Sequence, residues 1–234
     1  MNLPFGNKRA SFPLFVLLLV LGLTAWGRPL LAQGESENSK VNSNLGVVAT
    51  IPVDPTARYV NAGWGLLLGG GYNFTKRNGL VFEFMYDRFN ATDGALAPIR
   101  QAAADSNIGG HANLYTVTAN YRYELRGKKL GVYVIGGGGW FHRNASLSQS
   151  IQTPTIACTP IWQWWGYSCT AGTVTSTDKL QIASSNALGV NGGVGFTIKV
   201  GEPRYRVYFE SRYYYAPHDT VNTELIPITV GFRF

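Results

Sequence analysis

The chain has 234 residues, a formal net charge of +7 and 28 glycines, and its aromatic and charged fractions are 13% and 14%. This length suits one domain, and low charge combined with many aromatic residues and glycines predicts an all-β fold with few helices. Without Lys8, Arg9 and Arg28 the charge falls to +4, from 17 basic and 13 acidic residues. An excess this small argues against nucleic-acid binding, which needs a clustered basic face.

The first 32 residues have the parts of a secretory signal peptide. Lys8 and Arg9 precede an apolar run from 12 to 26, and small or apolar residues precede a cleavage site after Ala32. The alternative is a membrane-spanning helix, but the run is shorter than the ~20 residues that such a helix needs. We therefore expect residues 1–32 to be a cleaved signal peptide, followed by a polar periplasmic lead-in over residues 33–44.

Eight candidate strands follow, most of them alternating apolar and polar residues, which is the period of a strand with two different faces. The first strand is the weakest, because Pro52 and Pro55 end it early. The glycines from 136 to 139 leave the facing of the fifth strand open. The predicted strands are Leu45–Pro52, Gly63–Phe74, Leu80–Phe89, Asn113–Leu125, Leu130–His142, Asn186–Val200, Tyr205–Tyr215 and Ile226–Phe234.

The connections between these strands differ in length in a regular way. Those after the second, fourth and sixth strands are tight, whereas residues 90–112 and 143–179 form long connections after the third and fifth strands. Bacterial membrane barrels have short periplasmic turns, longer outer loops and an even number of strands. No later apolar run approaches the length of a spanning helix, so a chain that enters a membrane here must do so as strands.

The two faces of the strands differ in charge. The last strand places Ile226, Ile228, Val230, Phe232 and Phe234 on one side. In the strands with clear alternation the charged residues share the opposite, polar face: Glu83, Asp87, Arg122, Glu124, Lys199, Arg206, Glu210, Arg212 and Arg233. The apolar face carries Tyr and Trp near the strand ends, as in interfacial aromatic girdles.

A soluble barrel or sandwich with its polar face in water explains the alternation equally well. It does not explain the terminal Phe234 or the unequal connections. The sequence therefore predicts an eight-stranded antiparallel up-and-down transmembrane β-barrel over residues 45–234. Eight strands leave a lumen just wide enough for side chains, and four acids and five bases sharing it must pair. We expect a charged plug instead of an open channel, with inward glycines leaving room for the arginines.

The chain resembles the small outer-membrane β-barrel proteins of the OmpA/OmpX type over residues 45–234. The resemblance rests on the signal, the strand number, the inward charges and the final Gly231-Phe-Arg-Phe234. It implies that Val230, Phe232 and Phe234 are the signal that the barrel-assembly machinery reads. The peptidoglycan-binding domain of OmpA itself has no counterpart, so anchoring to the cell wall is not implied.

The long connections carry the candidate chemistry. Cys158 and Cys169 enclose four aromatic residues, and export favours a disulfide between them. Two cysteines without a nearby histidine argue against a metal site, and the glycine runs match no nucleotide-binding motif. The segment His142-Arg-Asn-Ala-Ser146 lacks the His-x-Ser spacing of lipid A deacylases.

Three functions remain open. The first is a structural or surface-interaction barrel, with connections 90–112 and 143–179 available to an extracellular ligand. The second is a small-solute pore, and the third is an outer-membrane enzyme that modifies lipid. We expect the first function, in the bacterial outer membrane, with membrane lipid and the assembly machinery as partners and without catalytic residues, cofactor or nucleic acid.

Overall fold

The computed structural model describes residues 40–103, 106–161, 166–201, 205–219 and 221–234, with the backbone alone over 151–161 and 166–176. The expected signal peptide and residues 33–39 of the expected lead-in lie outside the described residues. No helix within the described ranges is long and apolar enough to cross a membrane.

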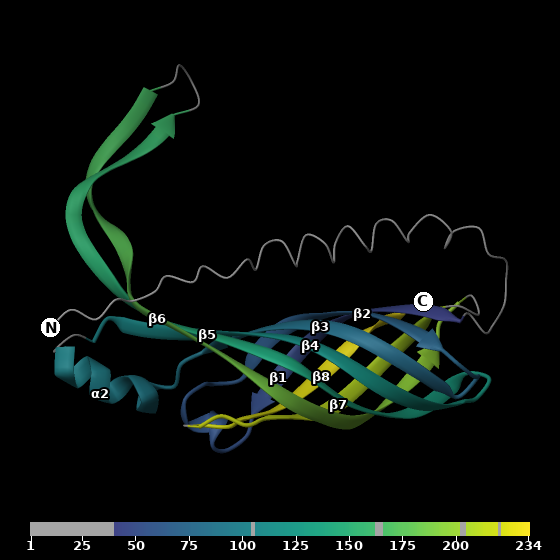
Figure 1. Cartoon of the computed structure of the whole chain (residues 1–234). Helices are drawn as coiled ribbons and strands as arrows, with labels where there is room; N and C mark the ends of the chain where they lie inside the picture. The colour runs from purple at the N-terminus through teal and green to yellow at the C-terminus, as the bar shows by residue number, and fades with distance from the viewer. Residues whose placement is uncertain (1–39, 104–105, 162–165, 202–204, 220) are drawn as a thin grey trace, which may run out of the picture. The chain divides into compact units, whose positions relative to one another are not determined.

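Eight strands in the described part of the chain form a closed barrel, in which each strand pairs with its neighbours in sequence (Figure 1). All pairs are antiparallel, and β1 closes the ring against β8. The predicted fold class is therefore confirmed. The strands are β1 (Val41–Pro52), β2 (Gly63–Asn73), β3 (Asn78–Asn90), β4 (Ile108–Arg126), β5 (Leu130–Ile161), β6 (Gly166–Lys199), β7 (Arg206–Ala216) and β8 (Thr223–Arg233).

The apolar residues of the alternating strands face the outside of this ring, and most of the polar residues face its inside. Lipophilic residues such as Trp64 and Val194 are more than 60% exposed on the outer wall, whereas Glu83 and Arg233 are at most 4% exposed inside it. On β5 the structure resolves the facing that the sequence leaves open. Val132 and Val134 point outward and the intervening Tyr133 is buried.

β1 is longer than the sequence predicts. It begins at Val41 and pairs along most of its length with both β2 and β8. Four residues of the expected lead-in, Val41 to Asn44, therefore belong to the barrel. Asn42 and Asn44 are buried inside the barrel. The segment is polar because these side chains help to fill the lumen.

The connection predicted over residues 90–112 is not a plain loop. It contains α2 (Asp93–Ala103), and β4 already begins at Ile108. The Thr92 hydroxyl accepts a hydrogen bond from the Ala95 amide at 3.2 Å, which caps the helix. Alanine is the best helix former, and Leu96 is buried, so this alanine-rich segment folds as a helix.

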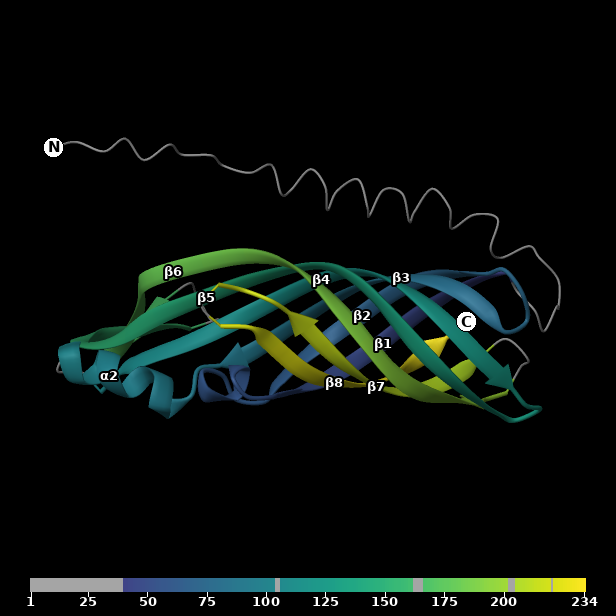
Figure 2. The same ribbon diagram turned by 60° about the horizontal axis from the view of Figure 1, so that its bottom comes forward.

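The prediction of a long loop over residues 143–179 is wrong. Both flanking strands continue through it, and β5 and β6 stay paired from Leu130↔Ile198 to Ile161↔Gly166, with one register shift after Leu147. In the described chain, β4 pairs with β5 as far as Gln149, and β7 pairs with β6 from Val190 onward. We call residues 150–161 and 166–177, which pair with each other beyond the ring, the outer ribbon (Figure 1; Figure 2).

Candidate functional site

The centre of the lumen holds an ion cluster built from β3 and β7. Arg212 Nη2 donates to Glu83 Oε1 at 2.9 Å, and Arg212 Nε donates to Glu210 Oε1 at 2.6 Å. The Tyr133 hydroxyl donates to Glu210 Oε2 at 2.8 Å, and Asn120 Nδ2 donates to Glu83 Oε2 at 2.8 Å. Each buried carboxylate thus has one cationic and at least one neutral donor, which is what a buried ion pair needs to offset its loss of hydration.

A second ion group lies nearer the short turns. Glu124 Oε2 accepts contacts from three guanidinium groups. The distances are 3.1 Å to Arg126 Nη2, 3.4 Å to Arg233 Nη1 and 3.6 Å to Arg122 Nε. Two cations from β4 and one from β8 therefore converge on one carboxylate, which ties β8 to β4 across the lumen.

Arg233 is held by aromatic rings as well as by ions. Its guanidinium carbon lies 4.9 Å from the Tyr133 ring centre and 5.2 Å from that of Tyr208, and its Nε donates to Asn44 Oδ1 at 3.0 Å. The Tyr208 ring fits because Gly231 faces it: a Cβ there would lie 2.7 Å from the ring. The sequence predicts that inward glycines leave space for arginine side chains, and Gly193 does so beside Arg212. Gly231 shows that they also leave space for tyrosine rings.

The outer half of the lumen is filled differently. Side chains from seven strands meet there in a layer that is at most 4% exposed, and we call it the apolar layer: Val48, Leu67, Met85, Phe89, Leu114, Phe141, Tyr214, Ala216 and Leu225. Sequence reasoning missed it by attending to charge alone. The signal was present, because Leu67, Met85 and Phe141 fall on the same strand faces as inward polar or glycine residues.

The nine predicted luminal charges are joined partly through neutral side chains: Asn44 donates to Glu83 Oε1 at 3.4 Å and accepts from Arg233, and the Thr197 hydroxyl donates to Glu124 Oε1 at 3.4 Å. Eight are buried inside the ring, and Lys199 is half-buried at the inner end of β6, opposite Arg206 in register. The buried Asp87 bonds to the Thr50 hydroxyl at 3.0 Å, and Arg206 donates to the Thr197 hydroxyl at 3.3 Å. The remaining six are the residues of the two ion groups above.

The outer rim brings together a serine and a histidine that the sequence does not link. Ser146 Oγ lies 2.9 Å from Nε2 of His111, which stands opposite Asn90 at the end of β3. Burial, Arg88 and Lys179 all lower the pKa of His111 from its usual value of 6.5. His142 instead bonds through Nδ1 to Asn186 Oδ1 at 2.8 Å, so the weak His142–Ser146 motif is not a contact pair.

The other predicted residues lie on two separate parts of the barrel. Val230, Phe232 and Phe234 point outward at the end of β8, 38–57% exposed. Cys158 and Cys169 are directly opposite each other in the register of the outer ribbon. No group of three or more His, Cys, Asp or Glu that could hold a metal occurs in the described residues.

Comparison with known proteins agrees with this architecture. Residues 15–234 match the family described as outer membrane protein beta-barrel domain. The chain belongs to that family. It is therefore a β-barrel of the bacterial outer membrane, its apolar wall lies against lipid, and charged residues such as Glu83 and Arg212 are buried within the ring.

Several solved structures are similar in fold. Ail, the attachment invasion locus protein of Yersinia pestis, is 16% identical, with 83% of this chain and 97% of that chain covered and a TM-score of 0.48. Neisserial surface protein A is 18% identical, with coverage of 83% and 96% and a TM-score of 0.45. A major outer membrane protein of Thermus thermophilus is 11% identical, with coverage of 84% and 99% and a TM-score of 0.49. No curated protein matches the sequence.

Proposed function

We propose that this outer-membrane barrel is a filled, non-enzymatic scaffold that presents the outer ribbon to a partner outside the cell. The length of the two ribbon strands carries the proposal. β5 and β6 have 32 and 34 residues, whereas a strand needs about 9–11 residues to span the bilayer. The short turns belong on the periplasmic side, so the excess length lies at the outer surface.

The composition of the ribbon indicates the kind of contact that it makes. Residues 150–177 contain no Asp, Glu, Lys, Arg or His and are rich in Thr and Ser, with three tryptophans and a tyrosine. Within the described chain, the outer edges of the ribbon pair with no third strand. Such edges accept an added strand, so the favoured partner is an extended, weakly charged segment of another protein.

The filled lumen favours a scaffold over a pore. The ion pairs of the inner half and the apolar layer of the outer half would both have to move for a solute to pass. In planar bilayers we expect no discrete conductance steps from the purified barrel. Regular steps in the wild-type protein would favour the small-solute pore instead.

The Ser146–His111 pair is the observation that keeps a lipid-modifying enzyme in view. A serine nucleophile needs a base that a third group orients, and no described acid is hydrogen-bonded to His111. We expect unchanged acyl chains in outer-membrane lipid when the protein is expressed. Loss of an acyl chain that depends on Ser146 would refute the non-enzymatic proposal.

Shortening the ribbon tests the proposed function directly. Replacing residues 150–177 by Asn-Gly joins Gln149 to Asp178, which are paired in register, through a favoured hairpin turn. We expect cells with this variant to lose at least tenfold in retention on arrays of immobilised proteins and peptides. A matched control shortens the β3–β4 connection by removing residues 93–103. Equal retention by wild-type and ribbon-shortened cells, at equal surface amounts, would sink the proposal.

Export and assembly form part of the same proposal. Residues 1–32 are removed as a signal peptide and the following residues lead into β1, which begins at Val41, so mass spectrometry of the mature protein should find Gln33 at its start. Val230, Phe232 and Phe234 are the residues that the assembly machinery reads. Deleting Phe234 should lower the folded amount in the outer membrane, and wild-type abundance of that variant would argue against this role.

A disulfide between Cys158 and Cys169 would hold the ribbon closed near its tip. Residues directly opposite on antiparallel strands have Cα atoms about 4.5–5.5 Å apart, within the range that a disulfide spans. Closing so short a loop contributes roughly 2–3 kcal/mol in the chain-entropy model. Thiol labelling of the exported protein should find no free cysteine before reduction, and labelling at both residues would contradict the bond.

A further inference from the structure

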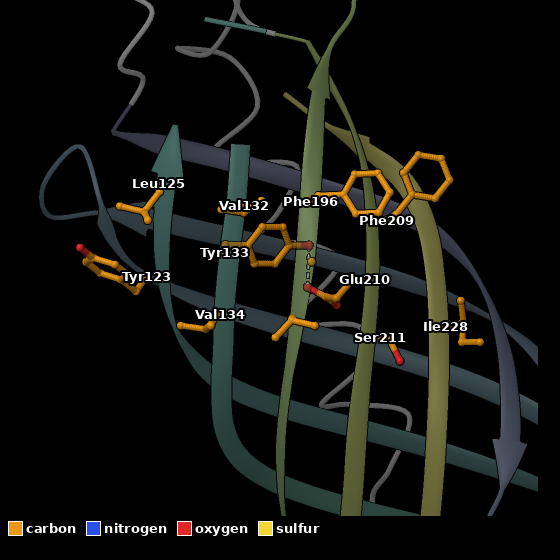
Figure 3. Close-up of a pocket in the computed structure, with 12 residues that line it drawn as sticks. Tyr123, Leu125, Val132, Tyr133, Val134, Phe196, Phe209, Glu210, Ser211 and Ile228 are labelled. Atoms are coloured by element: carbon orange, nitrogen blue, oxygen red, sulfur yellow. Dashed lines mark hydrogen bonds between the residues drawn. The ribbon is translucent and has the colours of Figure 1, made fainter. Parts of the chain in front are cut away.

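The lipid-facing wall of the barrel has an apolar hollow on one side. Its volume is about 750 Å³, within the range of roughly 300–1,000 Å³ that small-molecule pockets occupy. Five consecutive strands, β4 to β8, supply its lining (Figure 3). The outward-facing members are Tyr123, Leu125, Val132, Val134, Val194, Phe196, Phe209, Ser211 and Ile228.

The outward lining residues form two adjacent rows across the strands. The row nearer the periplasm runs from Leu125 through Val132 and Phe196 to Phe209 in register. Phe196 and Phe209 stack with ring centres 4.9 Å apart. These rows present hydrocarbon and aromatic surface, which suits an acyl chain lying along the wall.

Basic residues gather at the periplasmic end of this hollow. Lys128 and Lys129 are exposed in the turn between β4 and β5, three residues from Leu125 and Val132 respectively. The Lys129 carbonyl accepts a hydrogen bond from the Lys199 amide at 2.9 Å, which brings the end of β6 to the same corner. No described acid forms a salt bridge with Lys128 or Lys129, since the nearby Glu124 is buried inside the barrel with its own arginines.

We propose that the hollow and this basic corner together bind one anionic glycerophospholipid of the periplasmic leaflet. Its acyl chain lies in the hollow between the two rows, and its phosphate lies at the ammonium groups of Lys128 and Lys129. Each Lys near an anionic lipid surface adds to the attraction between the protein and that surface. The hollow selects a chain and the lysines select the headgroup charge.

A second copy of the barrel fits the hollow less well. Two copies meeting there in the same membrane orientation, related by a two-fold axis, would each bring Lys128 and Lys129 to one interface. Like charges brought together at an interface disfavour association. The charge pattern therefore favours an anionic lipid over self-association.

Lipid retained by the full-length barrel tests the headgroup part. The protein is reconstituted in nanodiscs of equimolar phosphatidylglycerol and phosphatidylethanolamine, transferred to detergent, and its bound lipids are counted by native mass spectrometry. We expect roughly thirtyfold enrichment of phosphatidylglycerol, from two lysines at the headgroup. The double variant Lys128→Gln/Lys129→Gln should reduce the enrichment to near unity.

The matched control removes two charges elsewhere on the same periplasmic rim. Lys40 and Lys76 are exposed beside β1 and in the β2–β3 turn, and neither β1, β2 nor β3 lines the hollow. Lys40→Gln/Lys76→Gln should keep the enrichment. An equal loss in both double variants, or no enrichment in the wild type, would overturn the site and leave only general attraction to a basic rim.

A second pair of variants tests the hollow itself. Val194 lines it and Val190 does not, although both point outward from β6 with exposures of 61% and 58%. Val194→Trp should lower retained phosphatidylglycerol several-fold, whereas Val190→Trp should leave it unchanged. Both variants keep an apolar residue toward lipid, and unaltered heat-modifiable migration checks that each barrel is folded. Equal retention by the two variants would contradict the acyl-chain site.

Discussion

The inner and outer halves of the lumen fill the same kind of space with opposite chemistry. In the inner half, Glu83, Glu124 and Glu210 are each bonded to arginines, and Glu83 and Glu210 to neutral donors as well. In the outer half the apolar layer packs around the buried Asp87, whose side chain accepts a hydrogen bond from the neutral Thr50 hydroxyl. An ion cluster penalises every arrangement that leaves a buried charge unpaired, whereas an apolar layer tolerates repacking at a modest cost. The inner half therefore defines which strands face each other, and the outer half adds packing stability.

The largest expected effect comes from breaking the inner half. Arg212→Leu leaves Glu83 and Glu210 buried without their shared cation, which costs about 3–5 kcal/mol. We expect the urea midpoint of the barrel in micelles to fall accordingly, and conductance to stay absent because the apolar layer remains. Full wild-type stability would show that the ion cluster is dispensable, and high conductance would contradict a lumen closed at two levels.

The matching change in the outer half is Met85→Ala. Met85 is 1% exposed within the apolar layer, and removing such a side chain costs about 2–5 kcal/mol, depending on how far the neighbours relax. The same urea titration measures it. Leucine is apolar and similar in volume to methionine, so Met85→Leu should keep most of the stability that Met85→Ala loses. A Met85→Leu variant as unstable as Met85→Ala would mean that the layer is not ordinary apolar packing.

A smaller change sharpens the comparison inside the ion cluster. Tyr133→Phe removes the hydroxyl that donates to Glu210 but keeps the ring beside Arg233. A hydrogen bond to a charged group contributes about 1.5–3 kcal/mol, so the variant should lose less than Arg212→Leu. Tyr208→Phe is the control, since no described group bonds to its hydroxyl. Equal effects of the two variants would contradict a specific role for the Glu210 bond.

The smallest expected effect is at the rim, outside both halves. Partial burial, Arg88 and Lys179 lower the pKa of His111 below 6.5, so its ring stays neutral to a lower pH than an unperturbed histidine. NMR titration of the ring should find a midpoint below that value, and Lys179→Gln should move the midpoint upward. A midpoint above 6.5 would contradict the arrangement of charges at the rim.

The sequence predicts the barrel well because lipid imposes a strict period on the strands. Val230, Phe232 and Phe234 had to alternate with Arg233, and the exposed and buried faces follow. The outer ribbon was not predicted because its Thr- and Ser-rich sequence has no alternation of apolar and polar residues. The helix α2 was not predicted because its alanines lie in a mostly polar segment between two strands, a pattern typical of a loop. The separation of the lumen into ion groups and an apolar layer depends on how neighbouring strands are aligned around the ring. The pattern within a single strand does not reveal that alignment.

The outer ribbon also has a mechanical consequence. A pull on its tip, directed away from the cell, loads β5 and β6 together along their own length. β5 pairs with every residue of β4, from Ile108↔Gln149 to Arg126↔Gly131. To separate the two strands, such a pull would have to break these backbone hydrogen bonds together instead of one at a time. An attachment made at the ribbon is thus anchored in shear, the direction in which paired strands resist tension best.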